Sequence, residues 1–88
     1  MFLASMIFQV EPNGVDDTRK QLDKIPELSL HGLHDDDVIV AVAETEDEQR
    51  LQQLSERIIA RYESIKTIYP TFLEFGTRRI VRISGKKN

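Results

Sequence analysis

Two kinds of hydrophobic periodicity follow one another along this chain, and their order constrains the fold more than any other feature. Four stretches show the two-residue alternation or the β-branched content that is typical of strands. Two stretches place apolar residues three or four positions apart, as a helix with one apolar side requires. The sequence predicts strands at 3–10, 27–33, 38–43 and 67–75, and helices at 15–25 and 46–65.

Turn formers and capping residues mark the boundaries of these elements. Asn13 is the expected cap of the first helix, and Pro26 ends that helix because a residue before proline avoids helical geometry. Thr45 and Glu48 have the spacing of a capping box at the start of the second helix. The run Asp35-Asp36-Asp37 predicts the turn of a hairpin between the second and third strands.

The order β-α-β-β-α-β predicts an α+β fold of the ferredoxin-like type, a split β-α-β arrangement. In it, two helices cover one face of a four-stranded antiparallel sheet. We expect one domain over residues 1–76, followed at 77–88 by a basic extension that adds a short strand and then frays. Pro70 indicates an edge position for the last strand, because proline cannot donate to a ladder. The pattern leaves the two faces of 67–75 unassigned.

The other face of the sheet has no helix over it, and strand parity predicts which residues lie there. We assign the larger apolar set of each strand to the core and the smaller or more polar set to the open face. The predicted core set is Met6, Phe8, Leu28, Leu30, Val38, Val40 and Val42. The predicted open-face set is Ser5, Ile7, Gln9, Ser29, His31, Ile39, Ala41 and Ala43. Such a face can accept a helix or a dimer partner.

The charges are unevenly distributed. Residues 76–88 contain five basic and no acidic residues, which leaves seven basic and fifteen acidic residues in the rest of the chain. An acidic body disfavours nucleic acid and favours basic partners. The chain has no cysteine, which excludes disulfides, thiolate metal sites and thiol catalysis.

Candidate metal ligands are few. His31 and His34 are the only histidines, and residues three apart on a strand point to opposite faces. The acidic run lacks the further oxygen ligands of a calcium loop. We therefore expect no metal, no cofactor and no catalytic residue.

The N-terminal segment lacks the positive charge of a secretory signal, and no apolar run could cross a membrane. The sequence predicts a cytoplasmic protein.

Several pieces of the chain, taken in order, form a pattern known from one family. They are the strand 5–10, the helix end 22–26, the apolar strand with its acidic helix start at 38–47, and Ile58, Ile65 and Ile68. This set resembles the NapD family of chaperones for the signal peptide of periplasmic nitrate reductase. The resemblance covers about residues 5–73, and residues 74–88 depart from it.

The resemblance implies a partner and a mechanism. NapD-type proteins hold the twin-arginine signal peptide of a molybdoenzyme's catalytic subunit in the cytoplasm, and so delay export until the cofactor is inserted. The peptide is implied to dock as a helix on the open face, with its arginines near carboxylates. The candidate carboxylates are Glu44, Asp35 to Asp37 and Glu74. The implied peptide-binding set is Ser5, Ile7, Gln9, Ser29, His31, Ile39, Ala41, Ala43 and Glu44. The protein is expected to be a monomer or a weak homodimer, without enzyme activity.

Two other functions remain open on the sequence alone. Regulatory domains of this fold bind small molecules as dimers, although they usually accompany a second domain that this sequence does not contain. A small dimeric enzyme using the sheet face as its cavity is a third hypothesis. The lack of a histidine–acid constellation argues against it.

Overall fold

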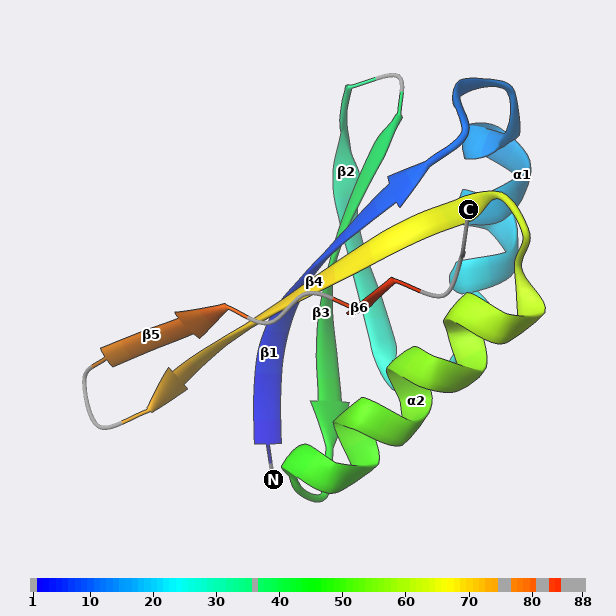
Figure 1. Cartoon of the computed structure of the whole chain (residues 1–88). Coiled ribbons are helices and arrows are strands. Elements are labelled where there is room, and N and C mark those ends of the chain that lie inside the picture. The colour runs from blue at the N-terminus through cyan, green and yellow to red at the C-terminus, as the bar shows by residue number, and fades with distance from the viewer. Residues whose placement is uncertain (1, 36, 75–76, 81–82, 85–88) are drawn as a thin grey trace.

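The computed structural model has the predicted order β-α-β-β-α-β, followed by two short strands (Figure 1). The structure describes residues 2–35, 37–74, 77–80 and 83–84. The elements are β1 (Phe2–Val10), a 3-10 turn (Pro12–Gly14), α1 (Val15–Leu22), β2 (Leu28–Asp35), β3 (Val38–Thr45), α2 (Glu48–Arg61), β4 (Ile65–Glu74), β5 (Thr77–Ile80) and β6 (Ile83–Ser84). The ferredoxin-like α+β fold is therefore confirmed.

The strands form one antiparallel sheet in the order β2-β3-β1-β4-β5, and β6 pairs with β4. The predicted hairpin is present, since β2 ends at Asp35 and β3 begins at Val38; the middle residue of the turn, Asp36, lies outside the described residues. Both helices lie on the same side of the sheet (Figure 1). Among the residues that the structure describes, no helix covers the opposite face.

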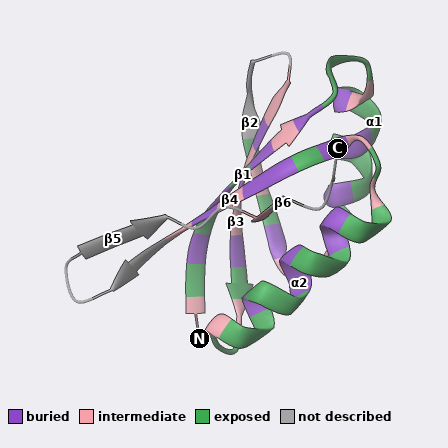
Figure 2. Cartoon of the chain, in the orientation of Figure 1, coloured by how far each residue is buried: buried purple, intermediate pink, exposed green. Residues whose placement is uncertain are grey.

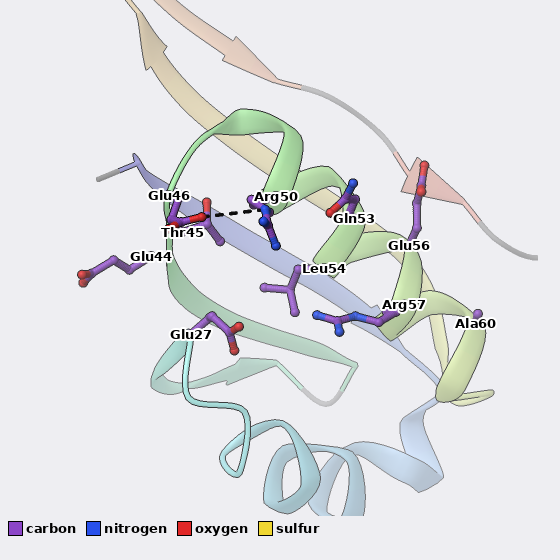
Figure 3. A pocket seen from close by; sticks show the side chains of 10 residues that line it. All are labelled: Glu27, Glu44, Thr45, Glu46, Arg50, Gln53, Leu54, Glu56, Arg57 and Ala60. Carbon is purple, nitrogen blue, oxygen red and sulfur yellow. Dashed lines mark ion pairs between the residues drawn. The ribbon is translucent and has the colours of Figure 1, made fainter.

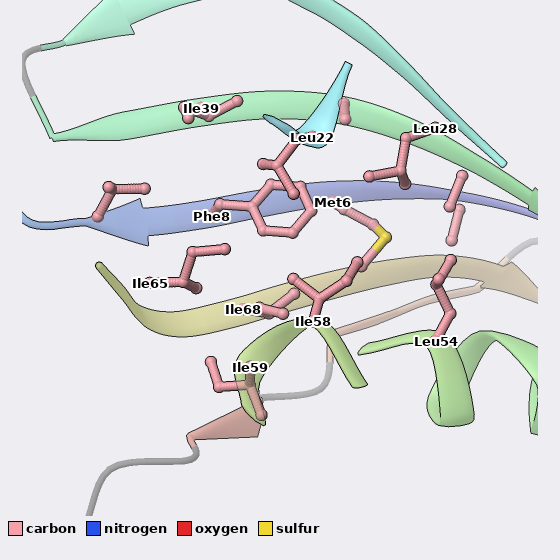
Figure 4. Close-up of a cluster of buried hydrophobic side chains, with 14 of the residues drawn as sticks. Met6, Phe8, Leu22, Leu28, Ile39, Leu54, Ile58, Ile59, Ile65 and Ile68 are labelled. Carbon is pink, nitrogen blue, oxygen red and sulfur yellow. The ribbon is translucent and has the colours of Figure 1, made fainter. Parts of the chain in front are cut away.

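The core lies between the sheet and the two helices. Burial alternates along β1, where Ala4, Met6, Phe8 and Val10 are buried and the residues between them are more accessible (Figure 2). Met6 and Phe8 sit in the middle of the apolar cluster shown in Figure 4. The helices contribute Val15, Thr18 and Leu22 from α1 and Leu51, Leu54, Ser55, Ile58 and Ile59 from α2.

The faces of β3 are the reverse of the predicted ones. Ile39, Ala41 and Ala43, which we expected on the open face, are fully buried in the core. The alternate residues Val38, Val40 and Val42, expected in the core, are half-buried on the open face.

Strand register explains this error. Directly opposed residues of an antiparallel pair share a face, and Met6 on β1 is opposite Ala41 on β3. Met6, Phe8 and the side chains of α2 fill most of the space between sheet and helices. Two of the buried residues of β3 are the small Ala41 and Ala43, although Ile39, opposite Phe8, is large. Side-chain size therefore does not identify the core face on β3, whereas it does on β1. On β2 Leu28 is buried and Leu30 packs against the core, as predicted.

The predicted helix caps are both displaced. Asn13 does not cap α1; it lies in the 3-10 turn, and Gly14 is the N-cap without a side-chain hydrogen bond. Asp47 caps α2, because its Oδ1 accepts a 2.8 Å hydrogen bond from the backbone N–H of Arg50. Thr45 instead donates from its hydroxyl to the carbonyl oxygen of Asp47. The capping box predicted from Thr45 is therefore wrong.

The ends of α2 and β4 also differ from expectation. α2 ends at Arg61 with Tyr62 as its C-cap, and Ile65, placed by its spacing on the helix, is the first residue of β4. β4 pairs with β1 on one side, and on its other side with β6 at Ile68 and with β5 at Thr71. Because both sides are paired there, the edge position inferred from Pro70 is wrong.

The location of the α2 cap can be tested by two single substitutions. We expect Asp47→Ala to lower the free energy of unfolding by about 1 kcal/mol, because the Arg50 N–H loses its acceptor. We expect Thr45→Ala to lower the free energy of unfolding by less, since it removes only a hydrogen bond to a carbonyl oxygen in a turn. Urea unfolding followed by circular dichroism measures both. A larger loss for Thr45→Ala than for Asp47→Ala would contradict this placement of the cap.

Candidate functional site: the open sheet face

The face of the sheet opposite the helices is the candidate site, and β1 and β3 form its centre. Because opposed residues share a face, the register of β1 with β3 and β4 identifies the residues there. They are Leu3, Ser5, Ile7 and Gln9 from β1, Val38, Val40, Val42 and Glu44 from β3, Ser29 from β2, and Thr67, Tyr69 and Thr71 from β4, of which Thr67 is buried. Among side chains that the structure describes, Leu3 and Ile7 are the exposed large apolar ones, at 55% and 39%.

These residues form rows that cross the strands. One row is apolar and consists of Val40, Ile7 and Tyr69. The next is made of smaller side chains, with Ser5 at its centre, and comprises Ser29, Val42, Ser5 and Thr71. A third pairs Leu3 with Glu44, whose side chain is exposed. The surface thus combines an apolar row with a row that carries hydroxyl groups, and it has a carboxylate at one edge.

Backbone hydrogen bonds hold the ends of this face in place. The N–H of Glu44 donates to the carbonyl oxygen of Glu27 at 2.9 Å, which ties the end of β3 to the segment before β2. At the other end, the N–H of Val10 donates to the carbonyl oxygen of Asp37 at 2.8 Å. An ion pair between Lys66 and Glu11, 3.9 Å apart, lies beyond β1. Rigid strands present the apolar rows, so little ordering is needed on binding.

The structure places only part of the predicted binding set on this face. Ser5, Ile7, Gln9, Ser29 and Glu44 lie there. His31 is exposed on β2, two residues beyond Ser29, where the register with β3 begins to shift. Ile39, Ala41 and Ala43 are buried beneath the helices and cannot contact a molecule on the open face. The side chains of Asp35, Asp36 and Glu74 lie outside the described residues.

Sequence reasoning also missed residues of this face. Leu3 was outside the predicted set although its parity with Ser5 and Ile7 indicates the same face. The valines of β3 were assigned to the core by size. Tyr69 and Thr71 were left unassigned, because both alternating sets of residues 67–75 contain large apolar side chains and parity alone gives no direction.

A groove of about 930 Å³ lies on the other side of the sheet, along α2 (Figure 3). Its lining mixes charges of both signs, including Arg50 and Glu46, whose side chains approach to 3.8 Å, and Arg57. A second hollow of about 610 Å³ adjoins it beside Ile25 and Pro26. Of the described residues, none form a group of three or more His, Cys, Asp or Glu that could hold a metal ion. Apolar residues also line these hollows, Leu54 in both and Ile58 and Tyr62 in the second, so the open face is distinguished by the exposure of Leu3 and Ile7.

In the described part of the chain, no helix has the length and apolar character of a membrane span.

Comparison with known protein families relates this chain to a family. Searches of curated proteins and of solved structures returned no match. A scan against protein families matched residues 1–74 to the model described as NapD protein. Because this match covers most of the chain, the protein belongs to the NapD family, whose general role is that of a chaperone in nitrate reductase maturation.

Proposed function

We propose that this protein binds the twin-arginine signal peptide of a nitrate reductase catalytic subunit in the cytoplasm, as a chaperone without enzyme activity. The observation that carries the proposal is the apolar sheet face with exposed Leu3 and Ile7, in a chain of the NapD family. The docking surface is that face. While the peptide is covered it is withheld from export, which gives time for cofactor insertion.

Apolar contact supplies the main part of the binding energy in this proposal. Burying a complete Leu or Ile side chain is worth about 1.5–3 kcal/mol, and Ile7 and Leu3 are both partly exposed in the free protein. The half-buried Val40 and Val42 extend the same surface. A helix with one apolar side, placed on this surface, would exclude water from all four side chains, which is the helix-in-groove mode of recognition.

Charge contributes orientation and association rate. The chain has a net charge of −3, and all of its acidic residues lie outside the basic C-terminal segment. An acidic surface attracts a basic peptide over a distance before contact. On the open face, Glu44 is the exposed carboxylate beside Leu3. An ion pair with a peptide arginine at this solvent-exposed position is worth at most about 1 kcal/mol.

Isothermal titration calorimetry tests this proposal. The protein is titrated with a synthetic signal peptide of the nitrate reductase catalytic subunit from the same genome, and with a control peptide in which both arginines are glutamine. We expect saturable binding with a dissociation constant of about 1 μM or less and weaker binding of the control. If neither peptide binds, the proposal is wrong and titrations with small metabolites become the next experiment.

A further inference from the structure

The rows on the open face differ in side-chain size on β1 and β4, where Ser5 and Thr71 stand beside Ile7 and Tyr69, while β3 has a valine in both rows. This difference constrains how a helix can lie there. Leu3 and Ile7 project from β1 on either side of Ser5. Along a strand, four residues span about 13 Å. An α-helix with its side chains is about 10–12 Å wide. A helix centred over Ser5 would therefore have Leu3 along one flank and Ile7 along the other.

The strand register continues the row around Ser5 across the sheet from β2 to β4. Ser5 is opposite Val42 on one side and Thr71 on the other, and Val42 is in turn opposite Ser29 on β2. Neighbouring strands are about 4.8 Å apart, so the row from β2 to β4 is about 14 Å long. That length corresponds to nine or ten helical residues at about 1.5 Å per residue.

The two flanks of this row differ in chemistry. On one flank, Ile7 stands between Val40 and Tyr69 in an apolar ridge. On the other, Leu3 stands beside Glu44. Glu44 also borders the helix-side groove, where Figure 3 shows its side chain directed away from Leu54 and Arg57. A helix that fits both flanks has a broad apolar side and a basic residue at one margin of it.

We infer that the bound peptide lies across the strands, over Ser5, as an amphipathic helix of about three turns whose basic margin faces Glu44. This inference rests on the proposed function and specifies the pose of the peptide on the same face. A helix running along β1 would instead have to rest on top of Leu3 and Ile7, with a gap beneath it at Ser5.

Paramagnetic relaxation measures this pose with the protein unaltered. A nitroxide is attached to the first residue of the synthetic signal peptide, and in a second sample to the last residue of its apolar segment. Amide signals of ¹⁵N-labelled protein are recorded for each complex. We expect one label to attenuate β2 around Ser29 and the other to attenuate β4 around Thr71. Labels that attenuate the two ends of β1, near Leu3 and Gln9, would overturn the inference.

The position of the basic margin is tested by charge removal. We expect Glu44→Gln to weaken peptide binding by about threefold to fivefold. Glu56→Gln is the matched control, because Glu56 is an exposed carboxylate on α2 that lines the helix-side groove, as Glu44 also does. A peptide in that groove would bind more weakly to both variants, whereas we expect Glu56→Gln to leave the dissociation constant unchanged. Equal effects of the two variants would overturn the assignment of Glu44. If calorimetry detects no binding of the peptide to the wild type, the proposed function is refuted as well. If the peptide binds as a helix along the strands, only the inferred pose of the peptide is refuted.

Discussion

Replacing Ile7 with glutamate is expected to weaken binding of the signal peptide at least thirtyfold while leaving the protein folded. Ile7 lies at the centre of the apolar row formed with Val40 and Tyr69. In the complex, the new carboxylate would be desolvated beneath an apolar helix without a partner, which is strongly unfavourable. Removing a central side chain of an interface typically costs about 2 kcal/mol or more of binding free energy. That energy corresponds to about a thirtyfold change in dissociation constant. The free protein should tolerate the change, because Ile7 is 39% exposed.

Calorimetry measures the affinity of this variant, and thermal unfolding followed by circular dichroism verifies its fold. Gln53→Glu is a suitable control, because it makes the same change of net charge at an exposed position of α2, on the other side of the sheet. We expect the control to bind within twofold of the wild type. If a folded Ile7→Glu variant bound as tightly as the control, the open face would not be the docking surface.

Ala41→Glu is expected to have the largest effect on stability, and to leave the protein mostly unfolded at 25 °C. Ala41 is fully buried beneath the helices, opposite Met6 on one neighbouring strand and Leu30 on the other. Glutamate there would need both space that the packed core lacks and the burial of an unpaired carboxylate. The combined cost is about 4 kcal/mol or more, comparable with the whole stability of a small domain.

Val40→Glu is the matched comparison, because Val40 is the neighbour of Ala41 on the same strand and lies on the open face. We expect this variant to remain folded and to lose peptide binding. Far-ultraviolet circular dichroism and urea unfolding distinguish the two proteins. If Ala41→Glu were as stable as Val40→Glu, the faces of β3 would be those inferred from side-chain size, and the register described here would be wrong.

The order of elements was predictable because each has a local signal. The alternation of β1, the three-to-four spacing of α1 and the turn chemistry around Asp37 depend on neighbouring residues alone. The faces of β3 depend instead on partners distant in sequence. All the residues of Val38–Ala43 are apolar, so alternation gives no direction, and only the pairing of Ala41 with Met6 resolves it.

Prediction of the candidate site is limited in the same way, because the face of a residue depends on strand pairing as well as on local sequence. Ser5, Ile7 and Gln9 were correctly placed because β1 alternates clearly and because the large Met6 and Phe8 identify the other face. Tyr69 could not be placed, because both alternating sets of residues 67–75 contain large apolar side chains, such as Ile68 and Phe72 in one and Tyr69 and Leu73 in the other. The cap of α2 was misjudged because Thr45 and Asp47 are both good capping residues. Which of them caps depends on where β3 ends, and that is set by its pairing with β1.

Amide chemical-shift mapping of the ¹⁵N-labelled protein during titration with the signal peptide tests the central claim most directly. The claim is that the peptide docks on the sheet face without helices. We expect the largest shifts at residues of β1, β3 and β4 around Ile7, Val40 and Tyr69, with little change along α2. Largest shifts along α2 and at residues 25–27, where the helix-side groove lies, would contradict it.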